Sequence, residues 1–189
     1  MKMLRKVLVF FLLLALLLIT IQAATAAVVI NEFMANAAGA GTDPAREWIE
    51  LYNTGTNTVD LTGYTLNDGE GTFTFGAVTI SAGGFIVLVN NQAEFNSVHT
   101  LPSSTQAVVY GALAPALELS DAGDELSLND STAQVDRVTY TSTNDGKTIG
   151  REVDGVGALV ELTQVSPGKA NKLPDITVPT LIDFGEVER

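Results

Sequence analysis

The stretch EWIELYN, Glu47–Asn53, contains the only tryptophan of the 189-residue chain and two carboxylates three positions apart. Side chains alternate between the two faces of a β-strand. An extended EWIELYN therefore has Ile49 and Leu51 on one face and Trp48 on the other. The first glutamate falls on the Ile49 face, and Glu50 falls on the Trp48 face. The two carboxylates are either a catalytic pair, a ligand set, or charges that the fold needs in its interior.

Outward from this stretch, the chain consists of short apolar runs separated by Gly, Asn, Asp, Ser and Thr. Alternation and β-branched residues favour strands over helices, and turn signals every 8–12 residues are typical of a sandwich. We predict an all-β sandwich of about ten short strands, beginning with Ala27–Ala35. The segment 36–45 is predicted to be a loop, and the polar segment Gln92–Gln106 to hold one helical turn.

The alternation also predicts the core, because a shift of one residue would exchange the two faces of a strand. The predicted core residues are Ile30, Ile49, Leu51, Leu66, Ile86, Leu88, Leu126, Leu128 and Val138.

Composition excludes several kinds of site. The chain has no cysteine and one histidine, His99, which excludes thiolate nucleophiles, Cys-ligated zinc, disulfides and a multi-histidine metal site. No dinucleotide or P-loop motif is present, and we expect no resident cofactor. The formal charge of -12 works against nucleic-acid binding, which depends on neutralising phosphates.

Residues 1–26 have the pattern of a secretory signal peptide. A basic start, MKMLRK, precedes the apolar run Val7–Ile21, and QAATAA offers Ala24 and Ala26 as an A-x-A cleavage site. The apolar run is short for a bilayer span of ~20 residues, and an uncleaved N-terminal anchor is the alternative. Cleavage would leave a charge of -15, because it removes three basic residues and no acid. We expect a secreted or cell-surface protein whose only membrane contact is through this segment.

Two further boundaries divide the chain. Residues 27–171 are predicted to form one domain. Pro167 and Pro174 mark its end, because proline removes a backbone donor and discourages strand pairing. Residues 172–189 are predicted to be a linker and the start of a truncated second β domain, because an isolated strand has nothing to bury itself against.

Several segments in this order resemble the lamin-tail domain family, in the type found in secreted bacterial and archaeal proteins. They are VVINEFMAN, EWIELYN with VDLTGYTLND, GGFIVLVNN, LELSDAGDELSLND with QVDRVTY, DGKTIGREVDG and SPGKAN. The resemblance covers residues 28–171 and implies an immunoglobulin-like β-sandwich. It carries a structural signature of Glu47, Trp48, Glu50, Asn53 and Arg151. Separately, VPTLIDFGEVER is similar to the first strand of the ASPM/SPD-2/Hydin-type immunoglobulin-like modules.

The glutamates of EWIELYN favour a structural role. Their odd spacing puts them on opposite faces of one strand, whereas a glycosidase pair must flank one bond at ~5–10 Å. A partly buried carboxylate needs a cation or backbone donors. Since the family places a basic residue near the closing segment, we hypothesise a Glu50–Arg151 ion pair. Arg46 and Arg137 are the rival partners.

Three acid-rich turns are candidate Ca²⁺ sites: Asn67–Gly71, Ser120–Glu125 and Thr143–Lys147. Calcium takes six to eight oxygen ligands. None of the turns fits the EF-hand pattern, and Asp-Gly pairs are also ordinary turn chemistry. We favour turn chemistry. The best calcium ligands, if calcium binds, are Asp121, Asp124 and Glu125.

His99 lies near Ser103 and Ser104, which raises the alternative of a Ser-His-Asp triad. The chain has no G-x-S-x-G segment to expose a nucleophile. We therefore expect His99 to be a surface loop residue.

These observations favour a non-catalytic extracellular module for adhesion or domain assembly. Its expected partners are an extracellular protein or polysaccharide and neighbouring domains of the same polypeptide. One alternative, implied by the resemblance, is an accessory domain of a secreted hydrolase or nuclease whose catalytic domain lies elsewhere. Another is a Ca²⁺- or glycan-binding module. Fold alone does not choose among them.

Overall fold

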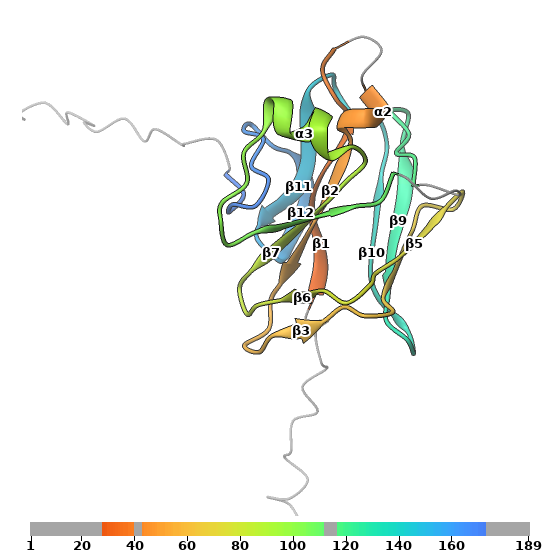
Figure 1. Cartoon of the computed structure of the whole chain (residues 1–189). Helices are drawn as coiled ribbons and strands as arrows, with labels where there is room; N and C mark the ends of the chain where they lie inside the picture. The colour runs from red at the N-terminus through yellow and green to blue at the C-terminus, as the bar shows by residue number, and fades with distance from the viewer. Residues whose placement is uncertain (1–27, 40–42, 112–116, 173–189) are drawn as a thin grey trace, which may run out of the picture.

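A six-stranded sheet forms the larger layer of the computed structural model, which describes residues 28–39, 43–111 and 117–172 (Figure 1). Its strand order is β12-β11-β1-β2-β7-β8, and only the β7–β8 pair is parallel. The strands are β1 (Val28–Asn36), β2 (Trp48–Asn53), β7 (Phe85–Val89), β8 (Gln106–Val109), β11 (Lys147–Val153) and β12 (Val156–Glu161).

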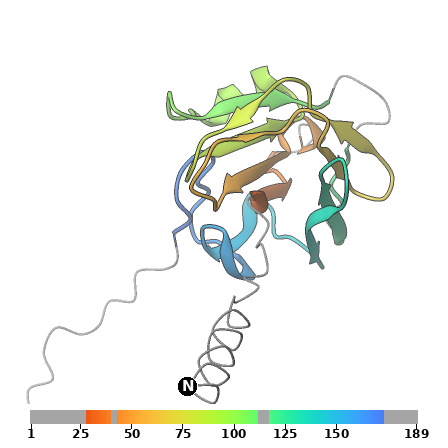
Figure 2. The same cartoon turned by 90° about the horizontal axis from the view of Figure 1, so that it is seen from below.

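A four-stranded sheet, in the order β10-β9-β4-β5, forms the second layer. Seen from below, the teal strands β9 and β10 lie to one side of the orange strands β1 and β2 (Figure 2). A small sheet pairs β3 with β6. These strands are β3 (Val59–Asp60), β4 (Thr65–Asn67), β5 (Thr72–Thr74), β6 (Thr79–Ile80), β9 (Asp124–Asn129) and β10 (Gln134–Tyr140).

Side chains from both larger sheets share one core. All nine residues that the sequence predicted for the core belong to it and are 0–4 % exposed. The inward-facing residues of these strands were therefore predicted correctly. The fold is mostly β with several sheets, which is consistent with the predicted immunoglobulin-like sandwich.

A second apolar cluster lies on the other face of the six-stranded sheet. Trp48 and Val87 belong to it, and Phe95 of the helix α3 (Gln92–Val98) packs on them. Asn91 caps this helix, since its side chain accepts hydrogen bonds from the first free N–H groups. The predicted helical turn is thus present, and Trp48 lies on the face opposite Ile49 as expected.

The predicted loop over 36–45 contains a short helix, α2 (Asp43–Arg46). Pro44 stands in its first turn, where its missing N–H costs no hydrogen bond. Neither described helix has the length and apolar composition that a membrane span requires. The predicted signal segment 1–26 and the predicted linker and second domain, apart from Lys172, lie outside the described residues.

A β-bulge in β1 positions the site described below. The pairing of β1 with β2 runs through Ile30↔Leu51 and then shifts to Glu32↔Glu50. A bulge inserts one extra residue, which changes the faces that later residues occupy. As a result Ile30 and Phe33 both reach the core, and Glu32 lies directly opposite Glu50.

Candidate functional site

The signature residues of β2 have separate structural roles. Trp48 is fully buried, with its ring edge-on to Phe95 at 6.4 Å and to His99 at 6.1 Å between ring centroids. Glu47, just before the strand, accepts a hydrogen bond from the Leu119 backbone N–H at 3.3 Å. The side-chain amide of Asn53 donates to the backbone oxygens of residues 57, 80 and 81. It thereby connects the end of β2 to the small β3–β6 sheet.

Glu50 is fully buried and is held by two amide donors. Its Oε1 accepts from Asn31 Nδ2 at 2.8 Å, and its Oε2 accepts from the Gly168 backbone N–H at 2.6 Å. Burial raises the pKa of Glu50 well above its usual value, and the hydrogen bond from Asn31 opposes this shift. The nearby charge of Glu32 raises it further.

Glu32 binds the same closing segment of the chain. Its carboxylate accepts hydrogen bonds from Thr148 Oγ1, the Ser166 backbone N–H and Ser166 Oγ, at 2.6, 3.1 and 2.8 Å. Burial raises the pKa of Glu32, and the bonds from Thr148 and Ser166 lower it. Both buried carboxylates therefore hold residues 166–168 against the six-stranded sheet.

Asp154 and Asn171 complete this network. Asp154 Oδ1 accepts from Asn31 Nδ2 at 3.0 Å and from the Asn171 backbone N–H at 2.9 Å. Asn171 Nδ2 donates to the Arg151 carbonyl at 2.8 Å. We call Glu32, Glu50, Asp154 and the segment 166–171 the closing network. It joins the first, second and eleventh strands to the end of the described chain.

The predicted Glu50–Arg151 ion pair is wrong. Arg151 Nη2 binds Asp136 at 2.9 Å, and Arg151 Nε donates to the Ile30 carbonyl. Asp136 in turn accepts from the Ile30 N–H at 2.8 Å. The pair therefore satisfies both backbone groups of Ile30, next to the bulge, and connects β11 to β10. Glu50 needs no cation, because amide donors already bind it.

The rival partners of Glu50 are excluded as well. Arg46 binds Glu94 at 3.3 Å, and Arg137 binds Glu125.

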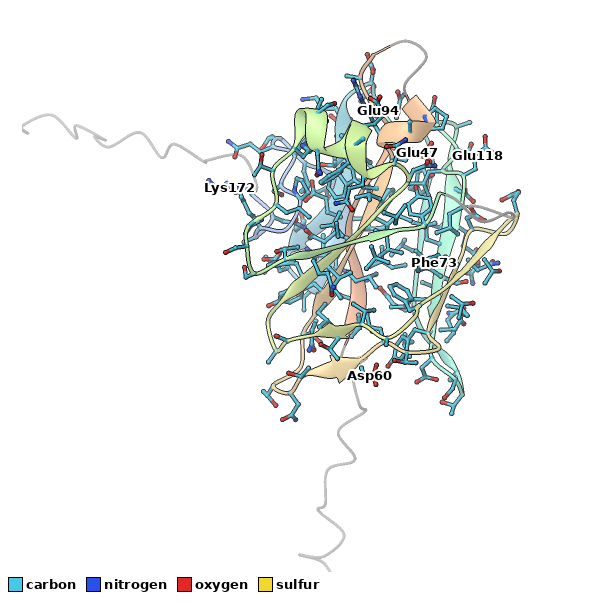
Figure 3. All side chains as sticks on the ribbon, viewed as in Figure 1. Glu47, Asp60, Phe73, Glu94, Glu118 and Lys172 are labelled. Carbon is cyan, nitrogen blue, oxygen red and sulfur yellow. The ribbon has the colours of Figure 1, made fainter. Side chains whose placement is uncertain are left out.

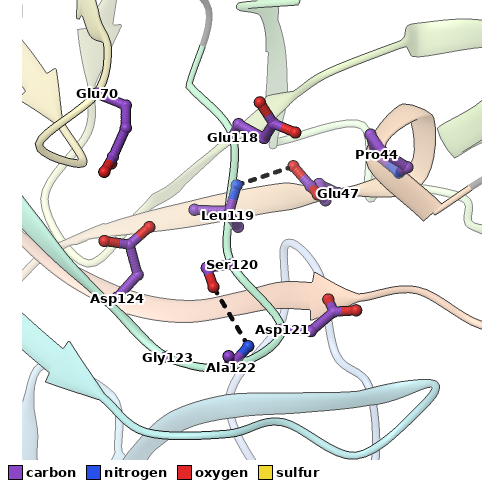
Figure 4. Close-up of a pocket in the computed structure, with 10 residues that line it drawn as sticks. All are labelled: Pro44, Glu47, Glu70, Glu118, Leu119, Ser120, Asp121, Ala122, Gly123 and Asp124. Atoms are coloured by element: carbon purple, nitrogen blue, oxygen red, sulfur yellow. Dashed lines mark hydrogen bonds between the residues drawn. The ribbon is translucent and has the colours of Figure 1, made fainter.

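An acidic pocket of about 580 Å³ opens at the α2 end of the molecule. Figure 3 shows Glu47 and Glu118 at this end and Asp60 at the opposite end. None of the described residues that line the pocket is basic. They are Pro44, Glu47, Glu70, Glu118, Leu119, Ser120, Asp121, Ala122, Gly123 and Asp124 (Figure 4).

The calcium candidates separate in the structure. Asp121 and Asp124 line the pocket, whereas Glu125 binds Arg137 on the surface. Asp68 and Glu70, from the turn 67–71, approach Asp124 instead. One carboxylate oxygen of each of these three residues lies within 4.8 Å of the others. Two of the three acid-rich turns are therefore neighbours, because β4 and β9 pair side by side.

His99 follows α3 in a loop, as expected, but it is half-buried rather than exposed. Its ring also packs on Phe95, 5.0 Å away. Burial, and then the charge of Arg46, lowers the pKa of His99. Among the described residues, no hydrogen bond joins its ring to Ser103 or Ser104, so the structure gives no support to the triad alternative.

The family model of the Lamin Tail Domain matches residues 21–142 of the chain, more than half of its length. No curated protein matches the sequence. The matched part includes the strands β1 to β10 and the acidic pocket. The closing network extends beyond it, yet β11 completes the same sheet by pairing with β1.

Proposed function

Because the chain belongs to the lamin tail domain family, we propose that it is a non-catalytic interaction module of a secreted or cell-surface protein, with an immunoglobulin-like sandwich as its scaffold. Its partners are an extracellular protein or polysaccharide and neighbouring domains of the same polypeptide.

The hydrogen bonds made by the two carboxylates of EWIELYN are the main support for this proposal. Glu50 is fully buried and accepts two amide hydrogen bonds of 2.6 and 2.8 Å. Glu47 is 2 % exposed and binds a backbone N–H. Glu47 lies just before β2 and Glu50 lies within it, and their side chains bind different parts of the fold. A catalytic pair must instead converge on one substrate bond. This geometry supports a role in holding the fold.

Binding and turnover assays on the exported protein test the proposal. The purified protein is applied to an array of extracellular-matrix proteins and polysaccharides and, in parallel, to nucleic-acid, glycoside and ester substrates. We expect saturable binding to at least one array component and no turnover. Turnover that E47Q or E50Q abolishes in a variant with a native circular-dichroism spectrum would contradict the proposal. It would then favour an enzyme.

Export is tested separately by sequencing the N-terminus of protein recovered from the culture medium. We expect it to begin at Ala27, after the A-x-A site. Protein retained in the membrane fraction with residues 1–26 intact would support the anchor alternative. Protein confined to the cytoplasm would contradict export.

The accessory-domain alternative predicts a different result. A module that delivers a hydrolase would bind the substrate of that hydrolase, so the array hit would be a hydrolysable polymer. A protein component among the hits would favour adhesion or assembly over this alternative.

A further inference from the structure

Three carboxylates from two turns converge, and two of them, Glu70 and Asp124, line the acidic pocket. Asp68 and Glu70 come from the β4–β5 turn, and Asp124 begins β9. One oxygen from each lies within 4.8 Å of the other two, and Figure 4 shows Glu70 and Asp124 facing each other. Calcium binds oxygens at about 2.4 Å, so two ligands on opposite sides of one ion are about 4.8 Å apart. The spacing therefore fits a single ion.

No side-chain cation of the described residues neutralises these three groups. The three salt bridges of the described residues involve other acids. Asp124 is partly buried, and burial raises its pKa. The charge of Asp68 adds to this shift. Carboxylates held this close without a positive partner repel one another, and a bound cation would remove that repulsion.

Asp68 is fixed in position without an ion. Its Oδ1 accepts from the backbone N–H groups of Glu70 and Gly71, and its Oδ2 accepts from Glu118 N–H at 2.7 Å. A carboxylate oxygen has two lone pairs, so Oδ2 retains one for a metal. Glu70 is exposed and free to adjust its side chain, while Asp68 is buried.

An unpartnered tyrosine hydroxyl on the residue opposite Asp124 is a second, independent indication of a ligand. Tyr140 lies opposite Asp124 in the β9–β10 pair and is 7 % exposed. Its hydroxyl oxygen is buried and has no hydrogen-bond partner. Because Tyr140 and Asp124 are directly opposite, their side chains lie on the same face of the sheet. Burial and then the charges of Asp124, Glu47, Asp121 and Asp68 raise the pKa of Tyr140, in that order. Buried polar groups normally have a partner, often an ordered water, and the water shell of a bound cation would provide one here.

We propose that this pocket binds one Ca²⁺ ion through Asp68, Glu70 and Asp124. Water completes its oxygen shell. Hard oxygen donors without His or Cys favour Ca²⁺ or Mg²⁺ over transition metals. Calcium fits better, because it tolerates irregular geometry whereas Mg²⁺ requires a near-ideal octahedron. An affinity in the range of extracellular modules, with Kd of about 10⁻⁴–10⁻³ M, is expected.

Thermal unfolding of the chelator-treated exported protein tests the site. CaCl₂ at ten times the dissociation constant should raise Tm by roughly 3–6 °C. E70Q and D124N should lose that rise, whereas E152Q, an exposed carboxylate on β11, should keep it. Asp68 is left intact, because its backbone hydrogen bonds support the turn. NaCl at the same ionic strength controls for general charge screening, and MgCl₂ tests selectivity.

Terbium luminescence gives a second measurement. Tb³⁺ occupies calcium sites and is excited through nearby tyrosines, so we expect emission that CaCl₂ displaces and that E70Q weakens at least about tenfold. An equal rise of Tm in wild type, E70Q and D124N, or an equal rise in NaCl, would overturn the proposal. So would an absence of any calcium effect on both Tm and terbium emission.

Discussion

At the scale of single residues, the main feature of the molecule is a pair of buried glutamates on neighbouring strands. Glu32 and Glu50 lie directly opposite each other in the β1–β2 pair. Like charges in such a position destabilise a sheet. The donors of Asn31, Thr148 and the segment 166–168 compensate for this, because a carboxylate needs hydrogen bonds when it leaves water. The carboxylates thereby make the fold depend on the segment 166–168.

This burial predicts that the contribution of Glu50 to stability falls as pH rises. The folded-state pKa of Glu50 lies well above its ordinary value of 4.5. Between the two values the Glu50 site binds more protons in the native state than in the unfolded state, so the contribution of Glu50 to stability is greatest below about pH 4.5 and declines above it. Gln does not titrate. The free energy of unfolding of wild type minus that of E50Q should therefore decrease from pH 4.5 to 8, by at most about 1.4 kcal/mol per pH unit.

Urea unfolding at several pH values measures this difference. E152Q on the surface of β11 controls for the loss of one carboxylate. If the difference in free energy of unfolding between wild type and E50Q stays constant or grows with pH, the pKa of Glu50 is not raised in the folded state.

Gly168 is predicted to be indispensable for the closing network. It has φ +76°, and an added Cβ would lie 2.9 Å from Pro102 Cδ and 3.0 Å from Thr105 Oγ1. Gly63 provides a matched control, because it has φ +80° with no atom within 4 Å of an added Cβ. Left-handed backbone alone costs a non-glycine residue roughly 1–2 kcal/mol. G168A should destabilise the protein by roughly 1–3 kcal/mol more than G63A in urea unfolding. Equal losses would mean that the segment 166–168 relaxes freely.

At the scale of elements, the Arg151–Asp136 pair joins the two sheets. Both side chains are mostly buried, 15 % and 14 % exposed, and the arginine reaches both carboxylate oxygens of Asp136. Charge-assisted bonds of this kind are stronger than surface pairs. A double-mutant cycle with R151A and D136A should give a coupling energy of about 1–3 kcal/mol.

The Arg137–Glu125 pair is the control for this cycle. Its side chains are 53 % and 43 % exposed, so water screens their attraction and the coupling should be clearly smaller. If the two cycles gave the same coupling, the inter-sheet pair would contribute no more than a surface contact.

The inward-facing residues of the strands were predictable from sequence because alternation is a local property. The alternation of side chains in EWIELYN and in the other predicted strands identified all nine core residues correctly. The partners of Glu50 were not predictable, because they lie 19 and 118 positions away and meet it only after a bulge shifts β1. The motif SPGKAN was the available signal, because its Ser166 and Gly168 supply hydrogen-bond donors to the buried carboxylates. The acid-rich turns were visible, but the pairing of β4 with β9 decided which of them became neighbours.

At the scale of the whole molecule, the balance of charge predicts an absence of DNA binding, although the name of the family suggests a nuclear protein. The processed chain would carry 22 acids against seven basic residues, near -15. The basic residues are Arg46, Arg137, Lys147, Arg151, Lys169, Lys172 and Arg189.

The structure further reduces the number of basic side chains that are available to bind DNA. Arg46, Arg137 and Arg151 are each bound to a carboxylate, so DNA would have to displace an existing partner from each. Non-specific affinity comes mainly from phosphates that release their counterions, and long-range repulsion from an acidic protein slows encounter. We expect no shift of duplex DNA in a gel at ~0.15 M salt by protein below about 10⁻⁶ M. A tighter complex would contradict this prediction. R137A and K147A would then test whether these two residues bind the phosphates, since loss of a phosphate contact reduces the dependence of affinity on salt.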